Sequence, residues 1–275
     1  MPHAVRGPGL GLGRSLALGA VLLALTLAGC ADEKQGSNVD PDQVDAVETP
    51  ELGACRVLAP EDVKLPTNAT KTVDCSEPHT AETFAVGELP ASLEDAGYDD
   101  EPVGAFAYKT CSQKFMAFLG ADESLVMRTV VSWAWFRPSE KAWEEGARWY
   151  RCDVVGGGDD SASYVDLPKT AKGLLLKLSD RWMVCADGAT VNGSPKVPCT
   201  EKHTWRAVTT IKLGEPDEKY PGDRLVEVKS RDFCSQSVGA WLNYPVDYDF
   251  GWTFFHEAEW EAGNRRSVCW AKTDR

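Results

Sequence analysis

The chain has 275 residues, of which 43% are hydrophobic and 26% are charged. This composition is typical of a globular protein and excludes a collagen-like or wholly disordered chain. Acidic residues outnumber basic ones by 42 to 29, which gives a formal net charge of -13. Because a negative surface repels phosphate groups, the charge argues against nucleic-acid binding and against membrane docking through basic residues.

The N-terminal segment 1–29 has the pattern of a lipoprotein signal peptide. Arg6 and Arg14 precede an uncharged apolar run over residues 15–29. That run is shorter than the roughly 20 residues that a membrane-spanning helix needs. It closes on Leu-Ala-Gly before Cys30, which resembles the bacterial lipobox, in which the cysteine is lipidated and becomes the mature N-terminus. We therefore expect a lipid at Cys30 and a location on the outer face of the cytoplasmic membrane; the alternative is a plain secretory peptide with an incidental cysteine.

Residues 30–52 follow as an acidic segment that contains Pro41 and Pro50 and scarcely any large apolar side chain. So little apolar surface cannot offset the entropy lost when a chain becomes ordered. We predict a disordered tether between the lipid and the first folded domain.

The cysteines that follow Cys30 form two sets of four. Exported proteins keep few free thiols, and assigning Cys30 to lipid leaves an even number of the nine cysteines. The intervals within the sets are 20, 36 and 41 residues and then 14, 35 and 35 residues. The sets are Cys55, Cys75, Cys111 and Cys152, and then Cys185, Cys199, Cys234 and Cys269. This spacing indicates that one unit occurs twice.

The residues around the cysteines repeat as well. A Cys-x-Glu-x-His-Thr motif occurs in each unit and contains His79 in the first and His203 in the second. An apolar stripe at i, i+4, i+7 and i+8 starts at each third cysteine and predicts a helix that ends at Gly120 or at Asn243. A Trp-Glu-x-Gly-x-Arg motif precedes each fourth cysteine. Its tryptophan, glycine and arginine are Trp143, Gly146 and Arg148, and then Trp260, Gly263 and Arg265.

Each unit has the pattern of an α+β fold. Alternating β-branched and aromatic residues predict strands at 54–58, 80–86, 130–136 and 147–155, and then at 182–186, 204–211, 250–255 and 264–271. Gly146 and Gly263 fall in the turn before the last strand, where a positive φ is tolerated. We predict two tandem homologous domains at 53–155 and 176–275, each a small antiparallel sheet with a packed helix and disulfide bonds. A linker rich in glycine and aspartate is expected at 156–175.

These motifs resemble the septum formation domain family, which comprises extracytoplasmic modules of actinobacterial anchored and secreted proteins. The family pattern is a first cysteine, Cys-Ser-x-Pro-His with an acid three residues on, a third cysteine, and Trp-x-x-Gly-x-Arg before the last cysteine. The first unit matches this pattern throughout, including Pro78 and Glu82. The second unit has Lys202 and Arg206 at those two positions, although its Tyr-Pro-Gly-Asp at 220–223 also looks like a family segment. The resemblance implies an association with cell division and the envelope, and no established chemistry.

Four cysteines in each unit allow three disulfide pairings. Disulfides are favoured over thiolate metal ligands because the chain is exported and has no Cys-x-x-Cys pair. Within a unit we prefer the first cysteine with the second, which flank one predicted hairpin. The third is then paired with the fourth, because the helix cysteine lies on the stripe that must face the sheet. The preferred pairs are Cys55 with Cys75, Cys111 with Cys152, Cys185 with Cys199, and Cys234 with Cys269.

His79, with the nearby Glu77 and Glu82, is the strongest candidate for zinc binding or general-base catalysis. The second unit keeps the histidine as His203 but has Arg206 where the first has Glu82. The feature that the units share is therefore not a set of metal ligands. We favour a structural histidine that donates a hydrogen bond near the disulfide, with no metal, cofactor or catalytic residue.

Two further features admit a binding role. Trp133 and Trp135 alternate along a predicted strand, as aromatic residues do in the second unit, and could form a platform for a wall glycan. We favour the core for them, because a domain of this size needs its large side chains inside. Arg148 and Arg265 could bind an anion, but an adjacent glutamate in each motif, such as Glu144, favours a local ion pair.

The sequence therefore predicts a non-enzymatic lipoprotein held at the membrane through Cys30. Its expected partners are an envelope or division-site protein or a wall glycan, and no nucleic acid. The alternative is a cell-wall hydrolase or a metal-dependent enzyme centred on His79.

Overall fold

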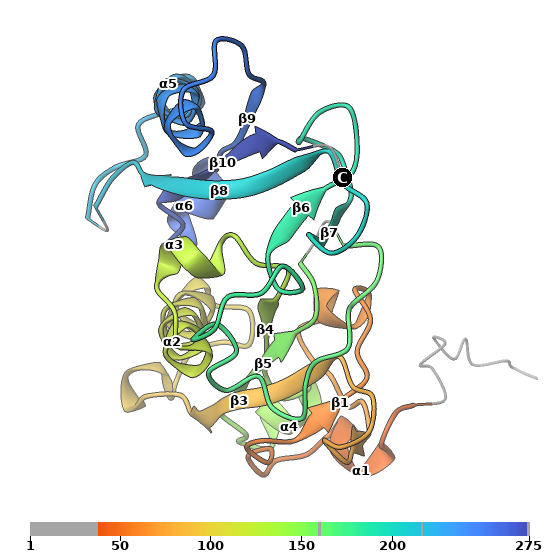
Figure 1. The fold of residues 1–275 in the computed structure, drawn as a ribbon. Coiled ribbons are helices and arrows are strands. Elements are labelled where there is room, and N and C mark those ends of the chain that lie inside the picture. The colour runs from red at the N-terminus through yellow and green to blue at the C-terminus, as the bar shows by residue number, and fades with distance from the viewer. Residues whose placement is uncertain (1–37, 159–160, 216, 274–275) are drawn as a thin grey trace, which may run out of the picture. The chain divides into compact units, whose positions relative to one another are not determined.

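The computed structural model describes residues 38–158, 161–215 and 217–273 (Figure 1). The predicted signal peptide and Cys30 lie outside the described residues, so that lipid attachment stays a prediction. Within the described ranges, no helix combines the length and the apolar character that a membrane span requires.

The first repeat, residues 53–155, is an antiparallel sheet with one long helix packed against it (Figure 1). The strands are β1 (Cys55–Arg56), β2 (Thr72–Val73), β3 (Ala81–Glu88), β4 (Ser132–Phe136) and β5 (Trp149–Val155), in the order β2-β1-β3-β5-β4. Helix α2 (Glu101–Leu119) buries the stripe that begins with Cys111 and continues through Phe115 and Leu119. It ends at Gly120, which has a left-handed φ of 73° and so closes the helix as predicted.

The second repeat, residues 176–273, has the same architecture. Its strands are β6 (Val184–Ala186), β7 (Lys196–Pro198), β8 (Trp205–Lys212), β9 (Phe250–Thr253) and β10 (Arg266–Lys272), in the order β7-β6-β8-β10-β9, and its long helix is α5 (Asp223–Trp241). The register agrees as well, since Cys55 pairs with Glu82 in one sheet and Cys185 pairs with Arg206 in the other. The two predicted α+β domains are thus confirmed as copies of one fold.

Short elements complete both copies. They are the helices α1 (Pro41–Val44), α3 (Glu123–Val126), α4 (Glu140–Glu144) and α6 (Glu257–Glu261), and the 3₁₀ helices η1 (Asp62–Lys64) and η2 (Ala91–Leu93). Helices α4 and α6 lead into Gly146 and Gly263, whose φ angles of 99° and 110° explain why glycine stands at each of these turns. The sequence did not predict strands β2 and β7, because segments of two and three residues are too short to show an alternating pattern.

Four disulfides connect the elements of the two repeats. They join Cys55 to Cys75, Cys111 to Cys152, Cys185 to Cys199, and Cys234 to Cys269. These are the pairs preferred from the sequence. In each repeat one bridge fastens the first strand beside its hairpin partner, and the other fastens the long helix to the last strand in sequence, β5 or β10.

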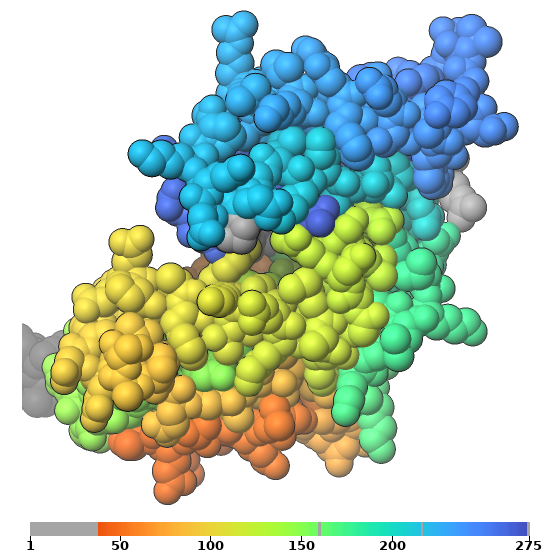
Figure 2. All heavy atoms as spheres, turned by 90° about the vertical axis from the view of Figure 1, so that its left-hand side faces the viewer, coloured from red at the N-terminus to blue at the C-terminus, as the bar shows by residue number. Residues whose placement is uncertain are grey.

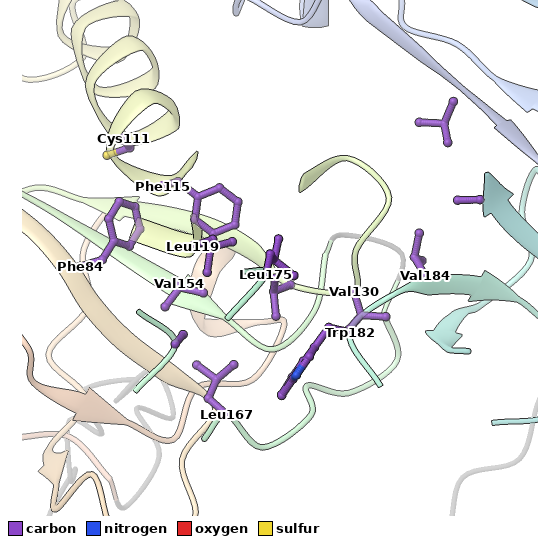
Figure 3. Close-up of a cluster of buried hydrophobic side chains, with 14 of the residues drawn as sticks. Phe84, Cys111, Phe115, Leu119, Val130, Val154, Leu167, Leu175, Trp182 and Val184 are labelled. Carbon is purple, nitrogen blue, oxygen red and sulfur yellow. The ribbon is translucent and has the colours of Figure 1, made fainter. Parts of the chain in front are cut away.

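One buried cluster contains side chains from both repeats (Figure 3). Trp182 and Val184 of the second repeat belong to the same cluster as Val130 of the first repeat. Backbone hydrogen bonds also join the two repeats. The Val130 N–H donates to the Trp182 carbonyl and the Val184 N–H donates to the Arg128 carbonyl, both at 2.9 Å. The repeats therefore share part of their core.

Polar contacts supplement this junction. Arg266 Nε lies 2.6 Å from Glu123 Oε2, and Thr210 Oγ1 donates to Ser124 Oγ at 2.8 Å. Figure 2 shows the face where the yellow-green segment of the first repeat meets cyan and blue side chains of the second. Helix α3, which the sequence did not predict, supplies the first-repeat side of these contacts.

Part of the segment predicted as a linker, 156–175, packs on the folded repeats over residues 167–175. Leu167, Ala171 and Leu175 are 6%, 0% and 3% exposed and lie in the shared cluster. Figure 3 shows Leu167 and Leu175 within it. These apolar residues occur at every fourth position, and the high content of glycine and polar residues in the segment as a whole obscures this pattern. Residues 167–175 of the predicted linker are therefore packed on the folded protein.

The prediction of a disordered tether also needs correction over residues 38–52. Trp149 Nε1 donates to the Ala46 carbonyl at 3.0 Å, and Asp45 Oδ2 lies 2.8 Å from Lys141 Nζ. Polar contacts with the first repeat hold this segment, which is why a search for apolar residues missed it. The earlier part of the predicted tether lies outside the described residues.

Candidate functional site

Each repeat has a copy of the same surface, and the two copies carry different side chains at equivalent positions. The shared register makes Arg206 the counterpart of Glu82, because each faces the first cysteine of its repeat. The surface that contains them begins at the histidine of the His-Thr pair and extends across the sheet to the last turn of the long helix. Its residues are His79, Glu82, Phe84 and Phe118 in the first repeat, and His203, Arg206, Val208 and Trp241 in the second.

The two histidines occupy equivalent turns, before β3 in the first repeat and before β8 in the second. His79 is 1% exposed, and its Nδ1 lies 2.8 Å from the Glu77 carbonyl. His203 is 2% exposed, and its Nδ1 lies 2.7 Å from the Glu201 carbonyl. A carbonyl oxygen only accepts, so Nδ1 carries the proton and donates it in both repeats. This is the arrangement expected of a structural histidine.

Glu82 is used by the fold of the first repeat. Its two carboxylate oxygens accept hydrogen bonds from Thr170 Oγ1 at 2.8 Å and from the Ala171 N–H at 2.6 Å. A general base must reach a proton of its substrate, whereas His79 is enclosed and Glu82 is already occupied. Within the described part of the chain, no three His, Cys, Asp or Glu side chains are grouped so that they could hold a metal ion.

The chain itself closes this surface in the first repeat. We call residues 167–175 the covering segment. The Leu167 N–H donates to the His79 carbonyl at 2.8 Å, and the Gly173 N–H donates to the Phe118 carbonyl at 2.7 Å. The covering segment thus contacts three of the four positions that define the surface, His79, Glu82 and Phe118.

In the second repeat the same surface lines an open cavity of about 390 Å³. Its charged and polar lining includes Arg128, Asp180, His203, Arg206 and Thr273, and the exposed ring of Trp241 forms part of its apolar wall. Arg128 comes from the first repeat, beside α3, so the two copies build this cavity together. Sequence reasoning did not identify Arg128, Asp180 or Trp241 as site residues.

Among the described residues, the lining of the cavity holds two arginines and one carboxylate. Arg206 Nη2 lies 2.6 Å from Asp180 Oδ1, which is the carboxylate of the lining. Arg128 donates from Nε to the Ser124 carbonyl and from Nη1 to the Val208 carbonyl, both at 3.0 Å. Among the described residues, Arg128 forms no ion pair. Burial lowers the pKa of Arg128, and the nearby charge of Arg206 lowers it further while Asp122 opposes the shift.

The Trp-Gly-Arg motif forms a structural corner in each repeat. The Arg148 guanidinium lies 4.2 Å from the centroid of the Trp143 ring, and its Nη1 donates to the Trp143 carbonyl at 2.8 Å. The Arg265 guanidinium lies 3.8 Å from the Trp260 ring and donates to the Trp260 carbonyl. The predicted ion pair between Arg148 and Glu144 is therefore wrong, since the arginine stacks on the tryptophan instead.

The aromatic strand residues lie at the margin of the cores. Trp133 and Trp135 are half-buried and pack against the shared cluster, as predicted. In the second repeat, Phe250 and Trp252 are half-buried and also line a shallow cavity of about 360 Å³. These rings therefore contribute to packing and still present part of their surface outward.

The chain is thus a tandem repeat of one disulfide-linked α+β domain. A family model described as septum formation matches residues 24–137 and 131–269. The chain belongs to the septum formation family, in agreement with its motifs, and the description of that family suggests a role related to cell division. Neither a curated protein nor a solved structure matches the chain.

Proposed function

We propose that the protein is a lipid-anchored binding protein on the outer face of the cytoplasmic membrane, with a role in the cell envelope or in septum formation. Three features support this proposal: the lipobox that ends at Cys30, disulfides suited to an oxidising compartment, and the family of both repeats. The observation that carries the binding role is the contrast between the two equivalent surfaces. The first is closed by the covering segment, and the second lines a cavity of about 390 Å³.

We propose a binding protein and not an enzyme, because the two residues considered for catalysis have structural roles. His79 donates to a carbonyl and is 1% exposed, and the Glu82 carboxylate accepts two hydrogen bonds from residues of the covering segment. Replacing His79 with Gln and Glu82 with Gln tests this part. A wall-directed activity that disappears in variants with an unchanged circular dichroism spectrum would support the hydrolase alternative and contradict a binding protein.

The anchor is tested by the substitution Cys30→Ala, with Ser37→Ala as the control near the same end of the chain. We expect the mature protein to partition with the membrane fraction and to carry the mass of a lipid, which Cys30→Ala removes and Ser37→Ala does not. Fractionation followed by mass spectrometry of the N-terminal peptide measures both. An unmodified Cys30 in membrane-associated protein would contradict lipid anchoring.

The partner is tested by photo-crosslinking in cells. Trp241 is 50% exposed at the cavity, and Val246 is 98% exposed on the loop that follows α5. A crosslinking residue at position 241 should capture envelope or division-site components that position 246 does not capture. Identical products from the two positions would show collision at the surface instead of binding at the cavity.

A further inference from the structure

The covering segment shows what kind of molecule fits this surface. In the first repeat the occupant is a peptide segment that has no regular secondary structure over 167–171 and turns over 172–175. Its backbone N–H groups donate to the carbonyls of His79, Phe118 and Leu119. The last of these hydrogen bonds comes from the Leu175 N–H at 3.0 Å. Leu167 and Leu175 enter the core, while the Thr170 hydroxyl and the Ala171 N–H donate to Glu82. The fold therefore already binds a peptide at one copy of the surface.

The charge at the centre of the surface is reversed in the second repeat. Glu82 only accepts hydrogen bonds and is satisfied by a hydroxyl and an N–H of the covering segment. Arg206 stands at the same register position and only donates. The matching group on an occupant of the second surface must therefore be an acceptor, and a carboxylate forms the strongest hydrogen bonds with guanidinium groups.

The cations of the cavity have capacity for such a carboxylate. The ion pair with Asp180 is made by the Nη2 of Arg206, and the guanidinium has further donors. Arg128 is half-buried and meets backbone carbonyls at two of its nitrogens, without an ion pair in the described part of the chain. A half-buried charge that forms no ion pair is costly, and the carboxylate of a ligand would reduce that cost.

The cavity also offers an apolar wall. Trp241 is 50% exposed and Leu178 is 59% exposed, and both line it. The counterpart of Trp241 is Phe118, which is half-buried and whose carbonyl accepts from the covering segment. An occupant with apolar side chains next to its acid would cover Trp241 and Leu178, as the covering segment packs on the first repeat.

We propose that the cavity of the second repeat binds an acidic peptide segment of another protein. The segment lies along the surface as residues 167–175 lie along the first repeat, and its carboxylate meets Arg128 and Arg206. This inference rests on the proposed binding function and names the chemistry of the partner.

Two synthetic nonapeptides test the proposal with the full chain. One has the sequence of residues 167–175, LPKTAKGLL, and the other replaces its threonine with aspartate at the position that meets Glu82 in the first repeat. Titration calorimetry should show the aspartate peptide binding at least tenfold more tightly than the threonine peptide. Arg206→Gln should weaken the aspartate peptide at least tenfold. Lys202→Gln removes the same charge from a side chain that is 82% exposed, and it should change the affinity less than twofold.

Other occupants are outcomes of the same titration. Equal affinity of the two peptides, no saturable binding, or binding that is indifferent to Arg206→Gln would overturn the proposal. Inorganic phosphate or acetate that binds as tightly as the aspartate peptide would also overturn it, in favour of a small-anion site. Trp241→Ala, on the exposed rim, is the second variant if Arg206→Gln does not fold, and it should weaken the aspartate peptide severalfold. A negative result leaves the membrane and crosslinking tests to judge the proposed function separately.

Discussion

Arg151 is a charged side chain within a strand that is buried along its whole length. It is 1% exposed, and its Nε lies 3.1 Å from Asp153 Oδ2, within the distance of an ion pair although outside hydrogen-bond geometry. Asp153 is 0% exposed, and its Oδ1 accepts from Thr83 Oγ1 at 2.7 Å. Arg56 Nη1 donates to the same hydroxyl at 2.8 Å. Burial lowers the pKa of Arg151 to about 10, and the charge of Asp153 limits this shift, so the arginine stays protonated at neutral pH.

Asp153→Asn should destabilise the first repeat strongly, because it leaves two buried guanidinium groups without their carboxylate. Loss of one partner from a buried pair costs about 3 to 5 kcal/mol of unfolding free energy. Urea unfolding at pH 7, followed by tryptophan fluorescence, measures the difference. The control is Asp99→Asn, whose carboxylate is 84% exposed beside Arg137 and should contribute less than about 1 kcal/mol. Similar losses in the two variants would show that the buried network is not stabilised by its charge.

Among the elements, the N-terminal segment 38–52 is held on the first repeat by polar contacts. Hydrogen bonds from Lys141 and Ser139 hold the pKa of Asp45 below its ordinary value of 3.8. A carboxylate whose pKa is lowered in the folded state stabilises that state above its ordinary pKa, and the stabilisation is lost as the pH falls through the lowered pKa. The docking of this segment should therefore weaken under acid.

Hydrogen exchange of the α1 amides measures this docking. After correction for the intrinsic rate, we expect faster exchange below pH 3.8 and the same acceleration at neutral pH in Asp45→Asn. The change should not exceed about fivefold, since an exposed ion pair contributes up to about 1 kcal/mol. Asp42→Asn, on the same helix, serves as the control and should leave the exchange unchanged. If α1 exchanges as fast as an unfolded peptide in the unaltered protein, the segment is a tether after all.

Local signals in the sequence predicted the long helices and strands. They did not predict the segment that covers the first sheet. The apolar stripe of α2 and its terminal Gly120 predicted that helix, because both signals lie within a few residues of each other. The contact of Glu82 with residues 170–171 joins positions far apart in the chain, and no residue pattern near Glu82 predicts it. Arg128 reaches the candidate site only because α3 docks on the second repeat. A site built by the packing of two repeats has no local pattern in the sequence.

At the scale of the whole molecule, the core of the first repeat includes side chains that follow that repeat in the sequence. The first sheet and α2 bury Phe115 and Leu119, and the cluster around them continues through Leu167 and Leu175 to Trp182 (Figure 3). The family pattern of the first unit ends near its last cysteine, whereas the apolar side chains that cover this unit come later. A first domain cut at residue 155 would expose the surface that the covering segment closes.

Two truncated chains, 38–155 and 38–178, should therefore differ in stability. The shorter chain lacks the buried Leu167 and Leu175, and full burial of each leucine contributes about 1.5 to 3 kcal/mol. We expect the longer chain to be more stable by at least about 3 kcal/mol in urea unfolding and to have dispersed amide resonances. The longer chain with Leu167→Ala and Leu175→Ala keeps the backbone hydrogen bonds of the covering segment, and its stability should lie between those of the two truncated chains.

Equal stability of 38–155 and 38–178 would make residues 156–175 a linker that merely lies on the first repeat. It would also weaken the comparison between a closed and an open surface, because a segment that adds no stability is a poor guide to what the second surface binds.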